Sequence, residues 1–168
     1  SAERIMAVLN AENEIKDLKN ALVKSEFIDE IEFKNISFKY KDDDVLKDFS
    51  LTIKKGETVA LVGQSGSGKS TLANLITRFY DVNEGAVFID GINIKEVTKK
   101  SLRALMGIVS QDSILFNDTI ANNIKLGAQN ATDLAVLKAS EIANANEFIQ
   151  QLPKKFDTNI GDSGNTLS

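Results

Sequence analysis

The hydrophobic and polar positions follow two different periods along the chain. Apolar residues alternate with polar ones over residues 31–40 and again over 48–54, which is the pattern of β-strands. The polar run Lys41-Asp42-Asp43-Asp44 lies between them and predicts a turn. The first half of the domain therefore predicts an antiparallel pair of strands.

The first of these segments changes its phase in the middle. Ile31 and Phe33 stand at odd positions, whereas Ile36, Phe38 and Tyr40 stand at even ones. Since successive side chains of a strand point to opposite faces, this pattern predicts a strand with apolar residues on both faces.

Short apolar runs and helical periods fill the rest of the chain. Runs at 57–62, 85–90 and 106–110 predict strands, the first and last of them buried. Apolar residues that recur every three or four positions predict helices at 71–79, 98–104, 119–125, 132–143 and 145–151. Thr98 is the predicted N-cap of the helix at 98–104.

The N-terminal part is less regular. Residues 2–9 predict a short helix, and residues 10–30 predict a polar linker with one helical segment within 14–24. We find no internal repeat. The order of elements predicts an α/β fold with an added antiparallel sheet and a helical part.

The composition narrows the chemistry. At 168 residues and 42% hydrophobic the chain has the size of one globular domain. A net charge of −4, with no long run of lysine or arginine, argues against nucleic-acid binding. The absence of cysteine and histidine excludes thiol and Ser-His catalysis, so any metal is a hard, oxygen-bound ion such as Mg²⁺. No apolar run approaches the length of a membrane span.

One motif carries specific chemistry. The sequence motif G-x-x-x-x-G-K-[ST] is matched by Gly63, Gln64, Ser65, Gly66, Ser67, Gly68, Lys69 and Ser70, and Thr71 follows it. It lies between a predicted strand and a predicted helix, which is the context of a loop that binds the phosphates of a nucleoside triphosphate. The glycines let backbone N–H groups turn toward the phosphates, and the start of the helix adds its dipole.

The side chains of this motif have separate predicted roles. Lys69 places a positive charge between the β- and γ-phosphates, and the hydroxyl of Ser70 is a ligand for Mg²⁺. Thr71 is a further predicted phosphate contact. The alternative, a chance match in a glycine-rich turn, is disfavoured by the strand and helix on either side.

Asp90 is a weaker signal. It follows the apolar run Val87-Phe88-Ile89, as the Mg²⁺-binding aspartate does in enzymes with a phosphate-binding loop. Gly91 comes next and not an acidic residue, so a tight turn is the simpler interpretation.

The spacing of further residues resembles ATP-binding-cassette (ABC) ATPases of the exporter type, such as lipid A and multidrug half-transporters. Phe38-Lys39-Tyr40 is similar to the adenine-stacking segment of this family, and Ser110-Gln111-Asp112 resembles its Q-loop. Residues 114–124 resemble the segment that follows the Q-loop, and Leu167-Ser168 matches the first two residues of the Leu-Ser-Gly-Gly-Gln signature. The resemblance covers about residues 31–168.

The resemblance implies a fold and further site residues. The fold is a P-loop NTPase core, with part of a parallel sheet, plus an antiparallel β-subdomain and a helical subdomain. Tyr40 would stack on adenine, and Gln111 would reach Mg²⁺ or the attacking water. Phe116 and its neighbours would form part of a groove for a coupling helix. The alternative is that these residues are plain core, which is the prediction for Leu115 and stays open for Phe116.

The resemblance also implies partners and a place in the cell. Residues 1–9 resemble the cytoplasmic end of a transmembrane helix, 10–30 a linker, and 31–168 the N-terminal part of the nucleotide-binding domain. The partners would be a transmembrane domain and a second nucleotide-binding domain, as a homodimer. The whole protein would lie at the cytoplasmic side of the membrane, and the fragment itself would be soluble.

The family pattern continues past Leu167-Ser168 with Gly-Gly-Gln, an Asp-Glu strand and a switch histidine. No residue of this chain replaces the general base. We therefore expect an ATPase as the parent protein and no hydrolysis by this chain alone.

Other functions use the same loop. A non-transport ABC ATPase acting on DNA or ribosomes is disfavoured by the exporter-like segments at 1–9 and 111–124. A GTPase or small-molecule kinase is disfavoured because no Asn-Lys-x-Asp motif occurs. A nucleotide-binding module without turnover remains open for the fragment.

Overall fold

The computed structural model describes residues 5–6, 15–41, 43–110, 114–128 and 130–161. The chain divides into two compact units, Ser1–Ile108 and Val109–Ser168, and each is described by itself. Ile5 and Met6 are helical, and the rest of the helix predicted at 2–9 lies outside the described residues.

The first unit contains a four-stranded antiparallel sheet with the strand order β2-β1-β3-β4. Its strands are β1 (Glu30–Tyr40), β2 (Asp43–Lys54), β3 (Glu84–Ile89) and β4 (Ile92–Asn93). The predicted strands at 31–40 and 85–90 are confirmed. The second strand begins at Asp43, so the predicted turn at 41–44 is shorter than expected and the strand is longer.

A bulge in β1 explains the change of phase in its sequence. Asn35 has a left-handed backbone (φ 47°), and the pairing with β2 shifts its register between Phe33 and Ile36. Phe33, Ile36 and Phe38 are all buried, with exposed fractions of 4%, 0% and 5%. The prediction of a strand with two apolar faces was therefore wrong, because one extra residue turns both apolar sets to the same side.

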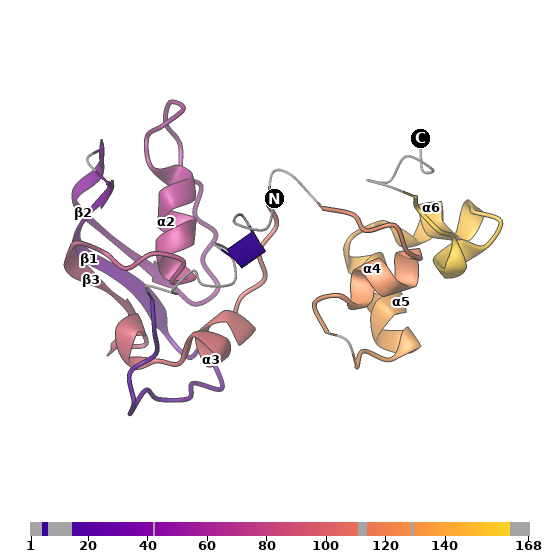
Figure 1. Cartoon of the computed structure of the whole chain (residues 1–168), viewed down its shortest axis with the longest axis horizontal. Coiled ribbons are helices and arrows are strands. Elements are labelled where there is room, and N and C mark those ends of the chain that lie inside the picture. The colour runs from indigo at the N-terminus through magenta and orange to yellow at the C-terminus, as the bar shows by residue number, and fades with distance from the viewer. Residues whose placement is uncertain (1–4, 7–14, 42, 111–113, 129, 162–168) are drawn as a thin grey trace. The chain divides into compact units, whose positions relative to one another are not determined.

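Helix α2 (Lys69–Ile76) lies on one side of this sheet, and the short helices η1 (Ile94–Glu96) and α3 (Lys99–Ala104) follow β4 (Figure 1). Leu72 and Leu75 of α2 are buried in the same core as the strand residues. Thr98 caps α3 and accepts a hydrogen bond from the N–H of Ser101, as predicted. The rest of this core is Phe33, Ile36, Phe38, Leu46, Val82, Val87, Ile89, Ile94, Val97 and Leu102.

Two predicted buried strands do not form. Residues 57–62 and 106–110 have no regular structure, and no described strand pairs with either. Val62 and Val109 are 91% and 96% exposed. An apolar β-branched run becomes a strand only when its N–H and C=O groups have a partner, so the part of a parallel sheet expected here is absent from the described residues.

The helical segment predicted within 14–24 is also wrong. Of that range the structure describes residues from Ile15 onward, and they form an extended chain with a turn at Lys19–Asn20. Leu22 makes a parallel bridge to Val97, so this segment is held by backbone pairing with a distant part of the unit. Its polar sequence has no helical period strong enough to compete with that pairing.

Asp90 ends β3 in the predicted tight turn, with φ 51°. Its carboxylate also accepts hydrogen bonds from the N–H groups of Ile28, Asp29 and Glu30 at 3.0, 2.7 and 3.1 Å. Lys24 forms an ion pair with it at 2.6 Å, and both side chains are 9% exposed. Desolvation by burial raises the pKa of Asp90, but the hydrogen bonds from Lys24 and the backbone outweigh it and lower the pKa to about 2.

We expect Asp90→Asn to lower the stability of the first unit by on the order of 2 kcal/mol at neutral pH, which is the free energy that corresponds to this pKa shift. The folded-state pKa lies below the ordinary value of 3.8. The stabilisation is therefore complete above about pH 4 and is lost as the pH falls toward about 2. Urea unfolding at several pH values measures it, with the exposed neighbour Asp29→Asn as the control. Equal acid dependence in Asp90→Asn and the unmodified chain would contradict the assignment.

The second unit is helical. It contains α4 (Ile120–Lys125), α5 (Asp133–Ile142), α6 (Asn146–Gln151) and η2 (Lys155–Asp157), so the three helices predicted there are confirmed. Ile120, Ile149 and Ile160 form its small core. Among the described residues, no helix of either unit has the length and hydrophobicity that crossing a membrane requires.

Candidate functional site: the phosphate-binding loop

The start of α2 differs from the starts of α3, α4 and α5. Those helices begin with Thr98, Thr119 and Thr132, whose side chains each accept a backbone N–H. Helix α2 instead follows Gly68, which is left-handed (φ 88°) and gives no side-chain cap, and its first turn has no acidic residue. The N–H groups and the positive end of the dipole are thus not neutralised by an anion of the helix itself, as an anion-binding helix start requires.

Strand β2 sets the position of this helix start. A Cβ on Gly68 would lie 2.8 Å from Cδ2 of Leu46 and 3.3 Å from Cγ1 of Val45. The loop therefore packs directly on the β1–β2 hairpin, and only glycine fits at position 68. No signal in the sequence indicated that Val45 and Leu46 contact the loop, because the contact arises from tertiary packing.

The ammonium group of Lys69 lies inside the loop. Its Nζ donates to the carbonyl oxygens of Gly63 and Gln64 at 2.9 and 2.8 Å, and to Oγ of Ser67 at 3.2 Å. A cation in the first turn of a helix is opposed by the helix dipole. The hydrogen bonds to the loop carbonyls offset this cost and hold the charge inside the loop.

The remaining loop residues leave the site open. Gln64, Ser65, Ser67 and Ser70 are exposed, and Gly66 has φ 83° with no atom within 4 Å of the place that a Cβ would take. Thr71 is 5% exposed, and its contact with phosphate stays a prediction. An uncapped helix start, a lysine and an exposed hydroxyl fit a triphosphate.

A metal would depend on that phosphate. The described residues contain no group of three or more Asp, Glu, His or Cys side chains able to hold a metal ion. The hydroxyl of Ser70 is a suitable hard oxygen ligand for Mg²⁺, which commonly keeps water and phosphate oxygens as its other ligands. Gln111, the second predicted metal ligand, lies outside the described residues.

Tyr40 is part of an aromatic cluster at the end of β1. Its ring meets the rings of Phe38 and Tyr80 edge to face, with centroids 4.8 and 5.0 Å apart. Tyr40 pairs with Asp43 in the hairpin, and Val45 and Leu46, two and three residues after Asp43, pack on Gly68. The fold thus brings Tyr40 to the hairpin end that packs on the loop, and its stacking on adenine stays a prediction.

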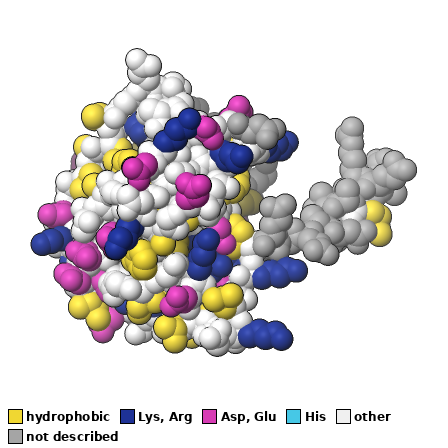
Figure 2. All heavy atoms as spheres, turned by 90° about the vertical axis from the view of Figure 1, so that its left-hand side faces the viewer, with side chains coloured by type: hydrophobic (Ala, Val, Ile, Leu, Met, Phe, Trp, Pro, Cys, Tyr) yellow, Lys and Arg dark blue, Asp and Glu magenta, His cyan; other side chains and the backbone are white. Residues whose placement is uncertain are grey.

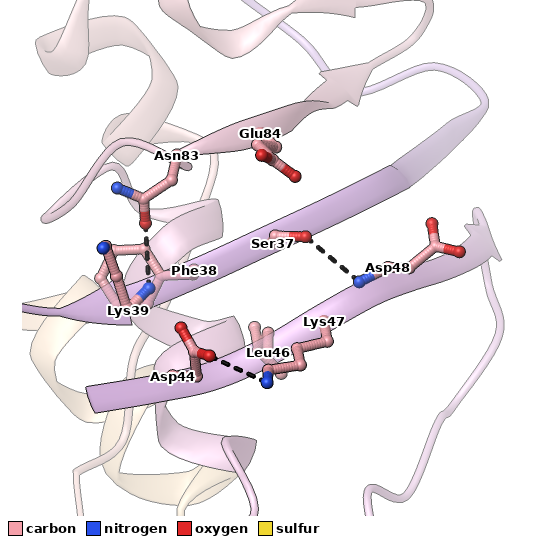
Figure 3. A pocket seen from close by; sticks show the side chains of 9 residues that line it. All are labelled: Ser37, Phe38, Lys39, Asp44, Leu46, Lys47, Asp48, Asn83 and Glu84. Carbon is pink, nitrogen blue, oxygen red and sulfur yellow. Dashed lines mark hydrogen bonds and ion pairs between the residues drawn. The ribbon is translucent and has the colours of Figure 1, made fainter. Parts of the chain in front are cut away.

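A second, polar pocket of about 390 Å³ lies on the sheet (Figure 3), and one of its lining residues, Leu46, also packs on Gly68. Lys47 and Asp44 form an ion pair across its rim at 2.9 Å. Oγ of Ser37 accepts the N–H of Asp48 at 3.2 Å, beside the β1 bulge. These polar groups are paired with one another, and none of the described residues that line the pocket belongs to the phosphate-binding motif.

The second unit has an apolar pocket of about 270 Å³. Leu115 was predicted to be core but is 38% exposed and lines this pocket. Phe116 is 55% exposed, and Asn123 holds its backbone through hydrogen bonds to both its N–H and its C=O. The other lining residues are Ile120, Asn123, Ile124, Ala145, Phe148, Ile149 and Ile160.

The distribution of charge on the surface agrees with the absence of a long lysine or arginine run in the sequence. The face seen in Figure 2 carries acidic and basic side chains intermixed with apolar ones, without a continuous basic stripe among the described residues. Any attraction of an anion to the loop would therefore come from the local position of Lys69 and not from a general positive field.

Comparison with known proteins identifies the family. The family described as ABC transporter matches residues 46–168, and the chain belongs to it. This class of protein binds ATP, which agrees with the geometry of the loop. The mixed helix and strand fold agrees with the predicted α/β class.

The individual relatives are exporters by name. The chain is 46% identical over 167 residues to the ATP-dependent lipid A-core flippase of Syntrophus aciditrophicus, covering 99% of this chain and 28% of the relative. It is 53% identical over 140 residues to a Staphylococcus aureus protein named as a putative multidrug export ATP-binding/permease protein, covering 82% and 24%. The structure of a bacterial Atm1-family ABC exporter with ATP bound matches with a TM-score of 0.90 and 41% identity, covering 99% of this chain and 30% of that one. The chain thus spans 24% to 30% of the length of these relatives.

Proposed function

We propose that this chain is the ATP-binding portion of an ABC exporter, in which Mg-ATP binding and hydrolysis drive the export of a lipid or amphipathic drug-like substrate. The observation that carries the proposal is Lys69, held by loop carbonyls at an uncapped helix start. The names of the relatives support the exporter role and the substrate class.

Different residues of the loop would bind the phosphates and the Mg²⁺ ion. The N–H groups of the loop and of the first turn of α2 would bind the phosphate oxygens, and Lys69 would exchange its carbonyl partners for phosphate. Ser70 would ligate Mg²⁺ together with Gln111. When bound, Mg²⁺ neutralises charge on the phosphate oxygens and so favours phosphoryl transfer.

The partners follow from the same proposal. A transmembrane domain would contact the apolar pocket of the second unit, which the exposed Leu115 and Phe148 line, and the exposed Phe116 next to Leu115 in the chain. A second nucleotide-binding domain would complete a homodimer at the cytoplasmic side of the membrane. Residues 1–9 would then be the end of a transmembrane helix, 10–30 the linker, and 31–168 the nucleotide-binding part.

Titration of the 168-residue chain with MgATP tests the binding function. We expect saturable binding and no phosphate release above background, because this chain has no residue in the role of the general base. Absence of binding at millimolar MgATP would contradict the proposed function, and Lys69-dependent phosphate release would contradict the lack of turnover.

We expect Tyr40→Ala to weaken the binding of both ATP and GTP by roughly 5- to 150-fold, since base stacking contributes about 1–3 kcal/mol and tolerates either purine. Tyr40→Phe keeps the ring and is the matched control. Fluorescence titration with each nucleotide measures the effect. Unchanged affinity for both nucleotides in Tyr40→Ala would refute the stacking role.

A further inference from the structure

Residues 15–24, called the strap here, are docked along the first unit by a backbone ladder. Leu22 donates its N–H to the carbonyl of Glu96 at 2.7 Å and accepts the N–H of Thr98 at 2.8 Å. The side chain of Lys99 donates to the carbonyl of Ile15. The strap is thus paired with the segment that joins η1 to α3.

The strap also contacts the end of α2, through Arg78. This side chain is 3% exposed, and its guanidinium donates to the carbonyls of Lys16, Lys95 and Val97 at 3.2, 3.3 and 3.4 Å. It also pairs with Asp81 at 3.0 Å. One buried cation therefore joins the strap, the η1–α3 connection and the residues that follow α2.

Asp17 completes this joint from the strap side. Its carboxylate lies 3.7 Å from the guanidinium of Arg78 and accepts the N–H of Lys99 at 3.0 Å, in the first turn of α3. The carboxylate thus faces a cation and the positive end of a helix dipole, and both attract it.

A second guanidinium fixes the same end of α2. Arg103 donates to the carbonyls of Thr77 and Arg78, both at 2.9 Å, and lies 4.6 Å from the ring centroid of Phe79. These carbonyls lie at the C-terminal end of α2, where cations are favourable. Arg78 itself has φ 54°, so its backbone is held by these contacts in a conformation that non-glycine residues rarely adopt.

Helix α2 has only eight residues, so its two ends lie about 12 Å apart. Lys69 and Ser70 stand at one end, and Arg78 follows the other. We propose that Arg78, Asp17 and Arg103 are positioning residues: they set α2 between the docked strap and the phosphate-binding loop, so that strap docking and nucleotide binding are linked. This inference rests on the proposed nucleotide binding.

The linkage has a reciprocal consequence. If docking of the strap favours the loop geometry that binds nucleotide, then nucleotide must favour docking by the same factor. The two states are the docked strap and the strap released from Arg78. If Asp17 had a purely structural role, its replacement would change the stability of the unit, but strap docking and nucleotide binding would not affect each other.

A label on the strap tests the proposal. The sequence has no cysteine, and Val23 is 79% exposed, so Val23→Cys gives a single attachment point for a spin label. Label mobility and MgATP affinity are measured in the 168-residue chain with Asp17 intact, with Asp17→Ala and with Asp17→Asn, the last being nearly isosteric. Glu26→Gln, an exposed carboxylate just beyond the strap, is the charge-matched control, and circular dichroism verifies folding.

We expect MgATP to lower the label mobility when Asp17 is intact, and both Asp17 variants to raise the label mobility and weaken MgATP binding at least about fivefold. Glu26→Gln is expected to change neither. A loss of MgATP affinity smaller than about fivefold in a folded Asp17 variant, or a label that does not respond to MgATP, overturns the linkage and leaves the proposed function standing. A chain that binds no MgATP at all overturns both.

Discussion

Replacing Lys69 with alanine is expected to weaken MgATP binding by about 100-fold, because charge-assisted hydrogen bonds contribute about 1.5–3 kcal/mol each and Lys69 can make more than one to phosphate. In the structure the ammonium group already lies among Gly63, Gln64 and Ser67, so little rearrangement is needed to present it to an anion. Isothermal titration of the folded chain measures the loss.

The control for this variant is Lys100→Ala. Lys100 is an exposed lysine of α3, and its replacement removes the same charge from the same unit. We expect Lys100→Ala to bind MgATP like the unmodified chain and to keep its free energy of unfolding within about 0.5 kcal/mol, as is usual for exposed positions. Equal affinity of Lys69→Ala and Lys100→Ala would contradict the assignment of the loop.

Replacing Gly85 with alanine is expected to destabilise the first unit by about 2–5 kcal/mol. About 1–2 kcal/mol of this comes from the left-handed backbone and about 1–3 kcal/mol from steric overlap. Gly85 has φ 74°, and a Cβ there would lie 2.3 Å from the carbonyl oxygen of Asn35 and 2.4 Å from that of Lys34. The clash is with backbone, which cannot move without disrupting the β1 bulge.

Gly91→Ala separates the two contributions. Gly91 has the same φ of 74°, but nothing lies within 4 Å of a Cβ placed there. We therefore expect Gly91→Ala to cost only the backbone strain of about 1–2 kcal/mol. Urea unfolding of both variants gives the difference, and equal losses would show that the contact between Gly85 and the bulge is unimportant.

The bulge at Asn35 shows where the pattern of apolar residues was insufficient. The alternation around Asn35 correctly predicted a strand but placed Phe33 and Ile36 on opposite faces. The side chain of Asn35 donates to Asp48 at 2.8 Å, and its N–H donates to Ser50 at 2.9 Å, so the bulge is stabilised by contacts with β2. Such contacts between strands are not visible in the spacing of one strand.

The strands expected at 57–62 and 106–110 show the same limit in another form. Their composition is that of buried strands, yet Val62 and Val109 are almost fully exposed. The composition of a segment indicates only that it is suited to form a strand. The strand forms only where a neighbouring segment supplies hydrogen bonds to its backbone. Helices contain their own hydrogen bonds, which explains why α2 to α6 were predicted within a few residues of their bounds.

The chain's residues alone predicted the phosphate-binding loop, because glycines, a lysine and a hydroxyl at fixed spacing are chemical requirements that local sequence meets. They also specified most helices and the α/β class. Only the tertiary structure decided that Leu46 packs on Gly68, that Asp90 binds the backbone of residues 28–30, and that Arg78 joins the strap to the end of α2. Each of these contacts joins residues more than 20 positions apart or in different elements, and packing of the whole unit brings them together.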